Sequence, residues 1–330
     1  MKKITVLGAG SWGTTLAKLL SVKAEKVILW EKNAGQIEHL RKNRYPSFFP
    51  WIRLPEKIAV TASLEEALEG AELLVLAVPS FAVRELARRM GRIFKKGSII
   101  SAVKGLEIGT LKRMSSVLEE EMEKVTVAVL SGPTHAEEVA RGLPSSCVIA
   151  SRNLAFAKRM QDLFSAPFFR PYYNRDVTGV ELGGALKNVI AIAAGICDGM
   201  GLGINAKAAL VTRGLEEMTR LGMKLGAKRE TFMGLSGIGD LMVTCFSGFS
   251  RNRNLGEWIG KGFTLKDSLE KVKMTSEGVF TCKALKKIDK IAQVEMPISR
   301  EVYQVLFRRK KPRNALKELL GRSLKEEFYS

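Results

Sequence analysis

The chain has 330 residues, of which 46% are hydrophobic and 26% charged, and it carries a formal net charge of +19 at pH 7. This length accommodates about two domains, and the longest uncharged apolar run, Val189 to Cys197, is about half as long as a membrane-spanning helix needs to be. Four well-separated cysteines and two histidines encode neither a disulfide framework nor a zinc site, so we expect a cytoplasmic protein with no transmembrane segment and no bound metal.

The first 20 residues have the pattern of a strand, a glycine turn and a helix. The turn contains Gly8, Gly10 and Gly13, which allow a tight turn, a close approach of the backbone to a pyrophosphate and packing of the helix on the strand. The N–H groups at the start of the helix then face the phosphates. We therefore predict a dinucleotide site. The alternative is an ordinary glycine-rich turn, whereas a signal peptide is excluded because the glycines interrupt the apolar run.

Further buried strands alternate with helical sequence along the next 130 residues. The strands are expected at 26–30, 58–61, 73–78, 98–103, 125–130 and 147–150. Ser63 and Glu66 have the spacing of a capping box at the start of a helix. Apolar strands that alternate with helices predict an α/β domain with a mostly parallel sheet covered on both faces. The aromatic segment 44–55 is expected to be an irregular loop that covers either a bound adenine or an apolar edge of the sheet.

Strand patterns end at about residue 177, and helical spacing follows, with helices expected at 180–195 and 205–225. The first of these helices is rich in Gly and Ala, so we expect it to be buried by close packing. We predict a dinucleotide-binding domain over residues 1–177 and an α-helical substrate and catalytic domain over residues 178–330.

Lys187 lies in this small, apolar helix. Burial disfavours the charged form of a lysine, so its pKa is expected to fall toward the range that suits a general base. The alternative is a lysine whose ammonium reaches solvent along an apolar stem.

Two loops after predicted strands place polar groups at the edge of the sheet where ligands bind. Lys104 follows one strand and is expected to point into the cleft. There it would bridge cofactor and substrate or lower the pKa of Lys187. The alternative is a lysine that is solvated in a turn. Ser131 to Thr134 follows the next strand and is suited to an anionic ligand. His135 has no evident partner, and we interpret it as packing at a helix terminus.

A third group of polar residues lies in the predicted helical domain. Ser250, Arg251 and Asn252 are suited to binding a phosphate, because guanidinium binds phosphate oxygens in bidentate fashion. Asp240 is flanked by small and apolar residues and is expected to pair with a lysine of the cleft. The alternative for Asp240 is a structural role in a turn or a helix cap. The alternative for Ser250, Arg251 and Asn252 is an ordinary basic loop.

The excess of cations, 53 Lys and Arg against 34 Asp and Glu, has three interpretations. The basic residues are spread along every predicted helix rather than gathered in a stripe with aromatics, which argues against nucleic acid. Attraction of small phosphorylated ligands fits better. Most single lysines are expected to be solvated, and association with an anionic membrane surface stays open.

Seven motifs occur in order over nearly the whole chain: Gly8 to Thr14, Val78 to Ser80, Val103 to Glu107, Ser131 to Thr134, Gly183 to Ile190, Gly239 to Leu241 and Ser250 to Arg253. Together they resemble the bacterial NAD(P)-dependent glycerol-3-phosphate dehydrogenase family. The resemblance implies a Rossmann domain followed by an α-helical domain. It also implies reversible interconversion of sn-glycerol 3-phosphate and dihydroxyacetone phosphate, mainly for phospholipid backbones.

The resemblance also implies roles for individual residues. It makes Lys187 the proton acceptor, and the implied substrate contacts are Lys104, Gly132, Thr134, Lys187, Asp240, Ser250, Arg251 and Asn252. The implied cofactor contacts, besides the glycine turn, are Ser11, Trp12, Lys32, Lys104, Ala136, Arg251 and Glu277.

The choice between NAD and NADP is open in the sequence. Glu31 lies where an acidic residue accepts a hydrogen bond from the ribose 2′-hydroxyl, whereas Lys32 next to it favours a 2′-phosphate. A hydroxyacid dehydrogenase of the 6-phosphogluconate or 3-hydroxyisobutyrate type is the alternative function. A non-catalytic nucleotide sensor or nucleic-acid binder is an alternative of another class, and a homodimer is compatible with the sequence.

Overall fold

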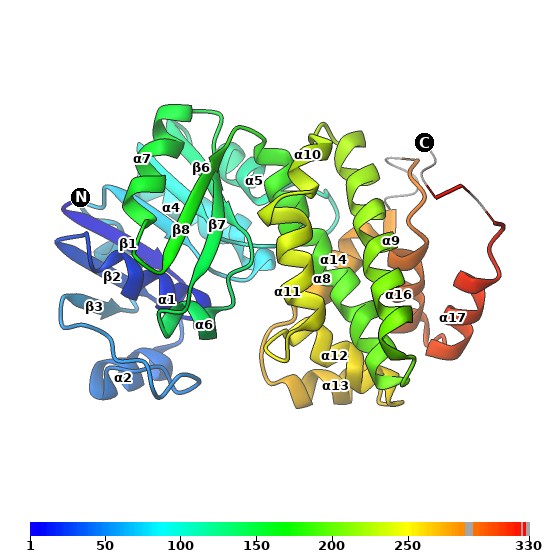
Figure 1. The fold of residues 1–330 in the computed structure, drawn as a ribbon. Coiled ribbons are helices and arrows are strands. Elements are labelled where there is room, and N and C mark those ends of the chain that lie inside the picture. Colours follow the sequence, from blue (N-terminus) through cyan, green and yellow to red (C-terminus); the bar gives the residue numbers. More distant parts are fainter. Residues whose placement is uncertain (288–292, 325, 328–330) are drawn as a thin grey trace.

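The computed structural model describes residues 1–287, 293–324 and 326–327. A sheet with its covering helices forms one part of the molecule, on the left in Figure 1, and helices alone form the other. The sheet has eight strands in the order β3-β2-β1-β4-β5-β6-β7-β8, and only the pairing of β6 with β7 is antiparallel. The strands are β1 (Lys3–Leu7), β2 (Lys26–Trp30), β3 (Ile58–Thr61), β4 (Leu73–Leu76), β5 (Gly97–Ser101), β6 (Val125–Ser131), β7 (Ser145–Ala150) and β8 (Phe169–Asn174).

The predicted sheet is confirmed, but some strand ends differ and one strand was missed. β7 begins two residues before its predicted start. β4 and β5 each end two residues before the predicted end. β8 was not predicted, because its residues alternate between buried and exposed instead of forming an apolar run, and it contains Pro171. Such a strand is tolerated at the edge of a sheet, where β8 lies.

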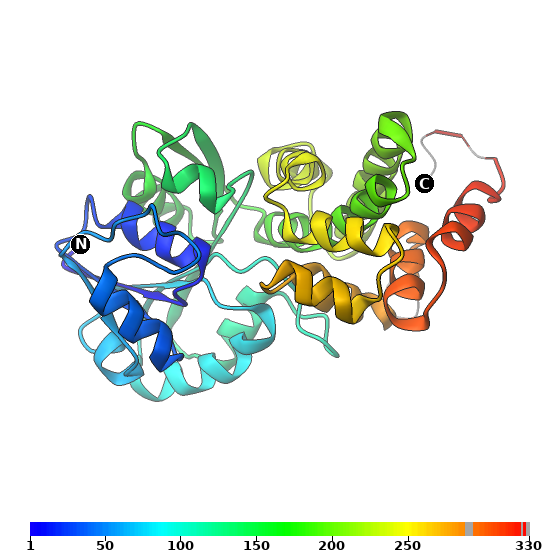
Figure 2. The ribbon, with the colours of Figure 1, turned by 90° about the horizontal axis from the view of Figure 1, so that it is seen from below.

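Helices cover both faces of the sheet because successive residues of each strand point to opposite sides. Ile4 and Val6 of β1 share a core with α1 (Ser11–Leu20) and α7 (Leu154–Phe164). Leu7 shares the opposite core with α3 (Leu64–Leu68), α4 (Val83–Ile93) and α5 (Met114–Glu121). The view in Figure 2 shows helices on the two sides of the sheet. Two more helices, α2 (Ala34–Asn43) and α6 (Ala136–Ala140), and the 3-10 turn η1 (Ser80–Ala82) complete this part.

The segment 44–55 has no helix or strand, as predicted. Its Phe49 and Ile52 are buried against Ala136 and Ala140 of α6, and Phe48 of the same loop lines the cavity described below. The loop thus covers an apolar helix surface and also reaches the cavity. The capping box is only half confirmed: the Ser63 hydroxyl accepts the Glu66 N–H at 3.1 Å, but the Glu66 carboxylate accepts the Thr61 hydroxyl instead of reaching back to the cap.

The helical part follows β8. Its helices are α8 (Val177–Gly199), α9 (Gly203–Lys224), α10 (Arg229–Phe232), α11 (Asp240–Phe246), α12 (Arg251–Gly260), α13 (Leu265–Val272), α14 (Glu277–Ala284), α16 (Pro297–Arg308) and α17 (Pro312–Leu320), with short turns η2 (Leu235–Gly239) and η3 (Leu285–Lys287). α8 and α9 are the two predicted helices. α17 lies at the end of the molecule farthest from the sheet (Figures 1 and 2). The domain division after residue 177 stays a prediction, and residues 328–330, with which the second domain was predicted to end, lie outside the described residues.

α8 is the central helix of the helical part, and its small residues allow close packing. A Cβ at Gly195 would lie 1.9 Å from the Arg253 carbonyl oxygen of α12, and a Cβ at Gly256 of α12 would lie 2.0 Å from the Ile192 carbonyl oxygen of α8. α8 is long and apolar enough to cross a membrane, but 94% of its apolar window is buried inside the molecule. The expectation that this helix is buried by close packing is confirmed.

Candidate active site

A cavity of about 520 Å³ lies between the carboxyl ends of the parallel strands and the helical part. Its size is that of a small-molecule site, and its place is where ligands bind to doubly wound sheets. Most of the predicted site residues line it: Gly8, Gly10, Ser11, Trp12, Glu31, Lys32, Lys104, Thr134, Ala136, Lys187, Ser250, Arg251, Asn252 and Glu277. Three further predicted site residues are not part of the cavity lining: Gly13, Gly132 and Asp240.

The glycine turn between β1 and α1 has the geometry that the motif requires. Gly8 has a φ of +104°, which favours glycine, and a Cβ at Gly13 would lie 1.9 Å from the Gly8 carbonyl oxygen. A Cβ at Gly10, in contrast, would meet nothing within 4 Å. Gly8 and Gly13 are therefore required by packing, whereas the missing side chain of Gly10 leaves room on the cavity side.

The start of α1 fits a dinucleotide phosphate. No side chain caps this helix, and its first turn has no acidic residue, so the first N–H groups and the positive end of the helix dipole are available to an anion. Ser11 and Trp12 line the cavity here, and the buried Trp12 Nε1 has no hydrogen-bond partner among the described residues. The residues present are those that would hold a dinucleotide.

Three charged side chains from distant parts of the chain meet at the other wall of the cavity. The Lys187 ammonium of α8 donates to Asp240 of α11 and, at 2.7 Å, to the Thr244 hydroxyl. The Lys104 ammonium, after β5, donates to the second Asp240 oxygen at 2.8 Å and to the Gly132 carbonyl at 2.9 Å. The expected pairing of Asp240 with a cleft lysine is thus confirmed, with two lysines instead of one.

Burial and the neighbouring charges set the protonation of this cluster. Burial lowers the pKa of Lys187 to about 7; the Asp240 carboxylate opposes this shift and the Lys104 ammonium adds to it. Burial alone would raise the pKa of Asp240, but the two ammonium groups hold it below its usual value. Lys187 is 5% exposed, and its ammonium is bonded to Asp240 inside the protein. The Lys104 ammonium is bonded to the same carboxylate. The alternative interpretation of each as a solvated lysine is therefore wrong.

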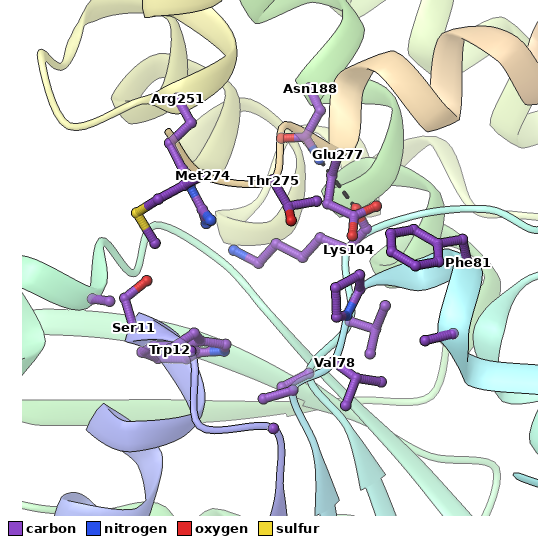
Figure 3. A pocket seen from close by; sticks show the side chains of 18 of the residues that line it. Ser11, Trp12, Val78, Phe81, Lys104, Asn188, Arg251, Met274, Thr275 and Glu277 are labelled. Carbon is purple, nitrogen blue, oxygen red and sulfur yellow. Dashed lines mark hydrogen bonds between the residues drawn. The ribbon is translucent and has the colours of Figure 1, made fainter. Parts of the chain in front are cut away.

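At the start of α12, the guanidinium of Arg251 is available to bind a ligand. The Ser250 hydroxyl caps this helix by accepting the Arg253 N–H at 3.2 Å. Asn252 is bonded within the protein, since its amide donates to Asn188 at 3.0 Å and accepts the Gly278 N–H at 3.0 Å. Arg251 has no hydrogen bond or ion pair to any residue that the structure describes, and it points from α12 into the cavity toward Ser11 (Figure 3). Burial lowers the pKa of Arg251, but a guanidinium stays protonated in proteins, so this side chain is suited to bind an anion.

Glu277 and His135 connect the two parts of the molecule around the cavity, whereas Thr134 contacts residues of its own part. The Glu277 carboxylate, at the start of α14, accepts the Ser80 N–H at 2.9 Å and the Ser80 hydroxyl at 2.5 Å. Thr134 lies at 3.5 Å from the Lys104 ammonium. His135 precedes α6, its Nε2 lies 3.2 Å from the Val243 carbonyl oxygen, and burial lowers its pKa. Its interpretation as packing at a helix terminus is confirmed.

Asn188 and Thr244 are among the polar residues of the site that the sequence analysis missed. The Asn188 amide donates to the Lys104 carbonyl at 3.1 Å and lies close to Lys104 in Figure 3. Thr244 lies one helical turn after Asp240, which is the signal that would have found it. Among residues 1–287, 293–324 and 326–327, no group of three or more His, Cys, Asp or Glu side chains could hold a metal ion.

The fold and the cavity define a dinucleotide-binding protein in which a buried lysine faces the same space as the glycine turn. Sequence comparison then identifies the family. The model of the N-terminal part of NAD-dependent glycerol-3-phosphate dehydrogenase matches residues 3–157, and the model of its C-terminal part matches residues 176–317. The chain belongs to the NAD-dependent glycerol-3-phosphate dehydrogenase family.

Relatives that carry this enzyme name match the chain over nearly its full length. The chain is 47% identical to a glycerol-3-phosphate dehydrogenase (NAD(P)+) of Thermoanaerobacter sp. over 99% of both chains. It is also 47% identical to the enzyme of the same name from Carboxydothermus hydrogenoformans, over 99% of this chain and 98% of the other. The crystal structure of glycerol-3-phosphate dehydrogenase from Coxiella burnetii superposes with a TM-score of 0.94, at 38% identity, over 97% of this chain and 99% of that one.

A D-mandelate dehydrogenase with NADH has a TM-score of 0.63 at 14% identity, and this likeness shows the fold alone.

Proposed function

We propose that this protein catalyses reversible hydride transfer between NAD(P)H and dihydroxyacetone phosphate, with sn-glycerol 3-phosphate as the other product. The observation that carries the proposal is the buried Lys187, whose pKa is lowered to about 7 and whose ammonium faces the cavity that also contains the glycine turn. The family and the names of its members support the substrate pair.

Lys187 carries the proton in this proposal. In the oxidation direction its neutral amine accepts the proton of the C2 hydroxyl, and in the reduction direction its ammonium donates a proton to the oxygen at C2. A bound nicotinamide cofactor supplies or accepts the hydride at C2. Asp240 and Thr244 position the Lys187 nitrogen through their contacts with it, which makes them positioning residues.

The phosphate of the substrate is proposed to lie at the start of α12. Arg251 provides a guanidinium without a hydrogen bond or ion pair to a described residue, Ser250 a hydroxyl, and Asn252 a side chain already held by Asn188. Binding the phosphate here orients C2 toward Lys187, so that binding energy contributes to the rate of the chemical step. Lys104, with Gly132 and Thr134 around its ammonium, completes the proposed substrate contacts.

The cofactor is proposed to lie along the sheet wall of the cavity. Its contacts are proposed to be Gly8, Gly10, Ser11, Trp12, Gly13, Glu31, Lys32, Lys104, Ala136, Arg251 and Glu277. The open space at Gly10 and the uncapped start of α1 support this placement.

We also propose a cytoplasmic enzyme that supplies glycerophospholipid synthesis, acts as a homodimer and has no nucleic-acid partner. All four cysteines are buried and unpaired, which suits a reducing compartment. Sedimentation equilibrium tests the dimer, and a salt titration with DNA and RNA tests the last statement, since binding that weakens steeply with salt would contradict it.

The function is tested by following oxidation of NADH and NADPH with dihydroxyacetone phosphate. The expected result is turnover that depends on the phosphate, with free dihydroxyacetone as the control. Turnover of 6-phosphogluconate or 3-hydroxyisobutyrate without turnover of dihydroxyacetone phosphate would instead favour the alternative class of hydroxyacid dehydrogenase.

A further inference from the structure

Glu31, directly after β2, is anchored to the glycine turn itself. Its carboxylate accepts the N–H of Ala9, between the two glycines, at 3.1 Å, and the N–H of Asn33 at 3.2 Å. Glu31 also lines the cavity together with Gly8 and Gly10. These two backbone hydrogen bonds hold a negative charge at a defined place beside the turn.

This place is where dinucleotide-binding sheets recognise the ribose next to the adenine. A carboxylate has about four acceptor positions, and the protein uses two of those of Glu31, so acceptors remain for ribose hydroxyls. A 2′-phosphate has no comparable interaction here, because two anions repel each other and the Ala9 N–H is already bonded to Glu31.

The cations at this end of the cavity do not outweigh the acidic groups. Lys32 is exposed and has no hydrogen bond or ion pair to a described residue, so its position is not fixed as that of Glu31 is. Arg89 of α4 is also exposed, and Glu85 on the same helix lines the cavity beside it. Two cations thus face two carboxylates, and only Glu31 is held by the backbone.

We infer that Glu31 is a specificity-determining residue and that the protein binds NAD(H) in preference to NADP(H). The inference rests on the proposed function insofar as the cavity holds a nicotinamide dinucleotide. The two exposed cations lessen the repulsion without removing it, so the expected preference is about tenfold or more in Kd.

Binding measurements on the full chain test this inference without turnover. Isothermal titration calorimetry gives Kd for NADH and NADPH, and for ADP-ribose and ADP-ribose 2′-phosphate, which lack the nicotinamide. NADH and ADP-ribose are expected to bind about tenfold tighter, or more, than their 2′-phosphorylated counterparts. Equal or reversed affinities in the wild-type protein overturn the inference, whatever the variants show.

Two variants separate Glu31 from the general charge of the cavity. Glu31→Gln keeps the shape of the side chain and removes its charge, so the ratio of the two affinities is expected to fall toward one. Glu85→Gln removes a carboxylate from the same end of the cavity that is not bonded to the glycine turn, and is expected to lower the ratio much less than Glu31→Gln does. Equal changes in both variants, or no change in Glu31→Gln with a wild-type melting temperature, overturn the role of Glu31.

The failure of this inference and the failure of the proposed function give different results. A protein that prefers NADH but does not reduce dihydroxyacetone phosphate contradicts only the function. One that reduces it and binds NADPH equally well contradicts only the inference. Binding of neither dinucleotide overturns both.

Discussion

The two walls of the cavity are built in different ways. The sheet wall consists of backbone: a turn of closely spaced glycines and the uncapped start of α1. The opposite wall, called the helical wall because Lys187 and Asp240 lie on α8 and α11, consists of charged side chains. Lys104, which follows β5, reaches this wall and shares the carboxylate of Asp240 with Lys187. The first wall is continuous in sequence, whereas the second joins residues more than 130 positions apart.

This difference separates binding from proton chemistry. A backbone turn presents N–H dipoles that neither gain nor lose a proton, so it suits the part of a ligand that does not react. A buried lysine changes its pKa with burial and with each neighbouring charge. The helical wall is therefore where the reactivity of the protein is adjusted, and variants of the two walls are expected to fail in different ways.

The largest effect is expected at Lys187. Lys187→Met removes the proposed proton carrier and should lower kcat by about 10²- to 10⁴-fold, with an unchanged circular dichroism spectrum. Lys207→Met is the matched control, because Lys207 is equally buried and pairs with Asp198 at 2.8 Å outside the cavity. Turnover of Lys187→Met near the wild-type value would remove this residue from the chemistry.

A smaller effect, on binding, is expected at Arg251. Arg251→Ala should raise KM for dihydroxyacetone phosphate about 10- to 150-fold, because a hydrogen bond to a charged group is lost, and should change little for free dihydroxyacetone. Arg253→Ala is the control: its guanidinium is held by Asp198 at 2.7 Å. A similar loss for both substrates in steady-state kinetics would argue against the proposed phosphate site.

Gly195, which packs α8 against α12 outside the cavity lining, and Gly10 of the sheet wall are expected to differ in what they support. Gly195→Ala places a methyl against the Arg253 carbonyl of α12 and should lower the free energy of unfolding by about 1–3 kcal/mol, measured by urea denaturation. Gly10→Ala, which meets nothing within 4 Å, should leave that free energy nearly unchanged and weaken NADH binding. Equal destabilisation by both would contradict the distinction between a packing glycine and a ligand glycine.

The smallest effect is a shift in pH dependence. Because the pKa of Lys187 is about 7, its amine is neutral above that pH and protonated below it, so kcat for oxidation should rise through pH 7 and kcat for reduction should fall. Asp240→Asn removes the charge that raises this pKa and leaves the Lys104 ammonium that lowers it, so both midpoints should move to lower pH.

Glu217 provides the control for this titration. Burial raises the pKa of Glu217 to about 7 as well, but its carboxylate accepts the N–H of Ile298 at the start of α16, outside the cavity. Glu217→Gln should leave both kcat profiles in place. A shift of the kcat profiles in Glu217→Gln, or no shift in Asp240→Asn, would show that a group other than Lys187 titrates.

Much of the fold could be predicted because its signals are local. The buried strands are short apolar runs, and α8 and α9 have helical periodicity, so neighbouring residues suffice to recognise them. β8 was missed because an edge strand needs neither an apolar run nor freedom from proline. The second half of the capping box failed because Thr61 lies within reach of the Glu66 carboxylate, which no spacing rule states.

The sequence by itself determined the glycine turn, the alternation of the first seven strands with helices, and the unusual position of a lysine in an apolar helix. Only the tertiary structure decided that Lys104 and Lys187 share one carboxylate and that Thr244 also holds the Lys187 ammonium. It also decided that Arg251 faces the cavity without a hydrogen bond to a described residue. The physical reason is range: backbone preferences act between neighbours in the chain, whereas burial and Coulomb interactions depend on which distant residues folding brings together.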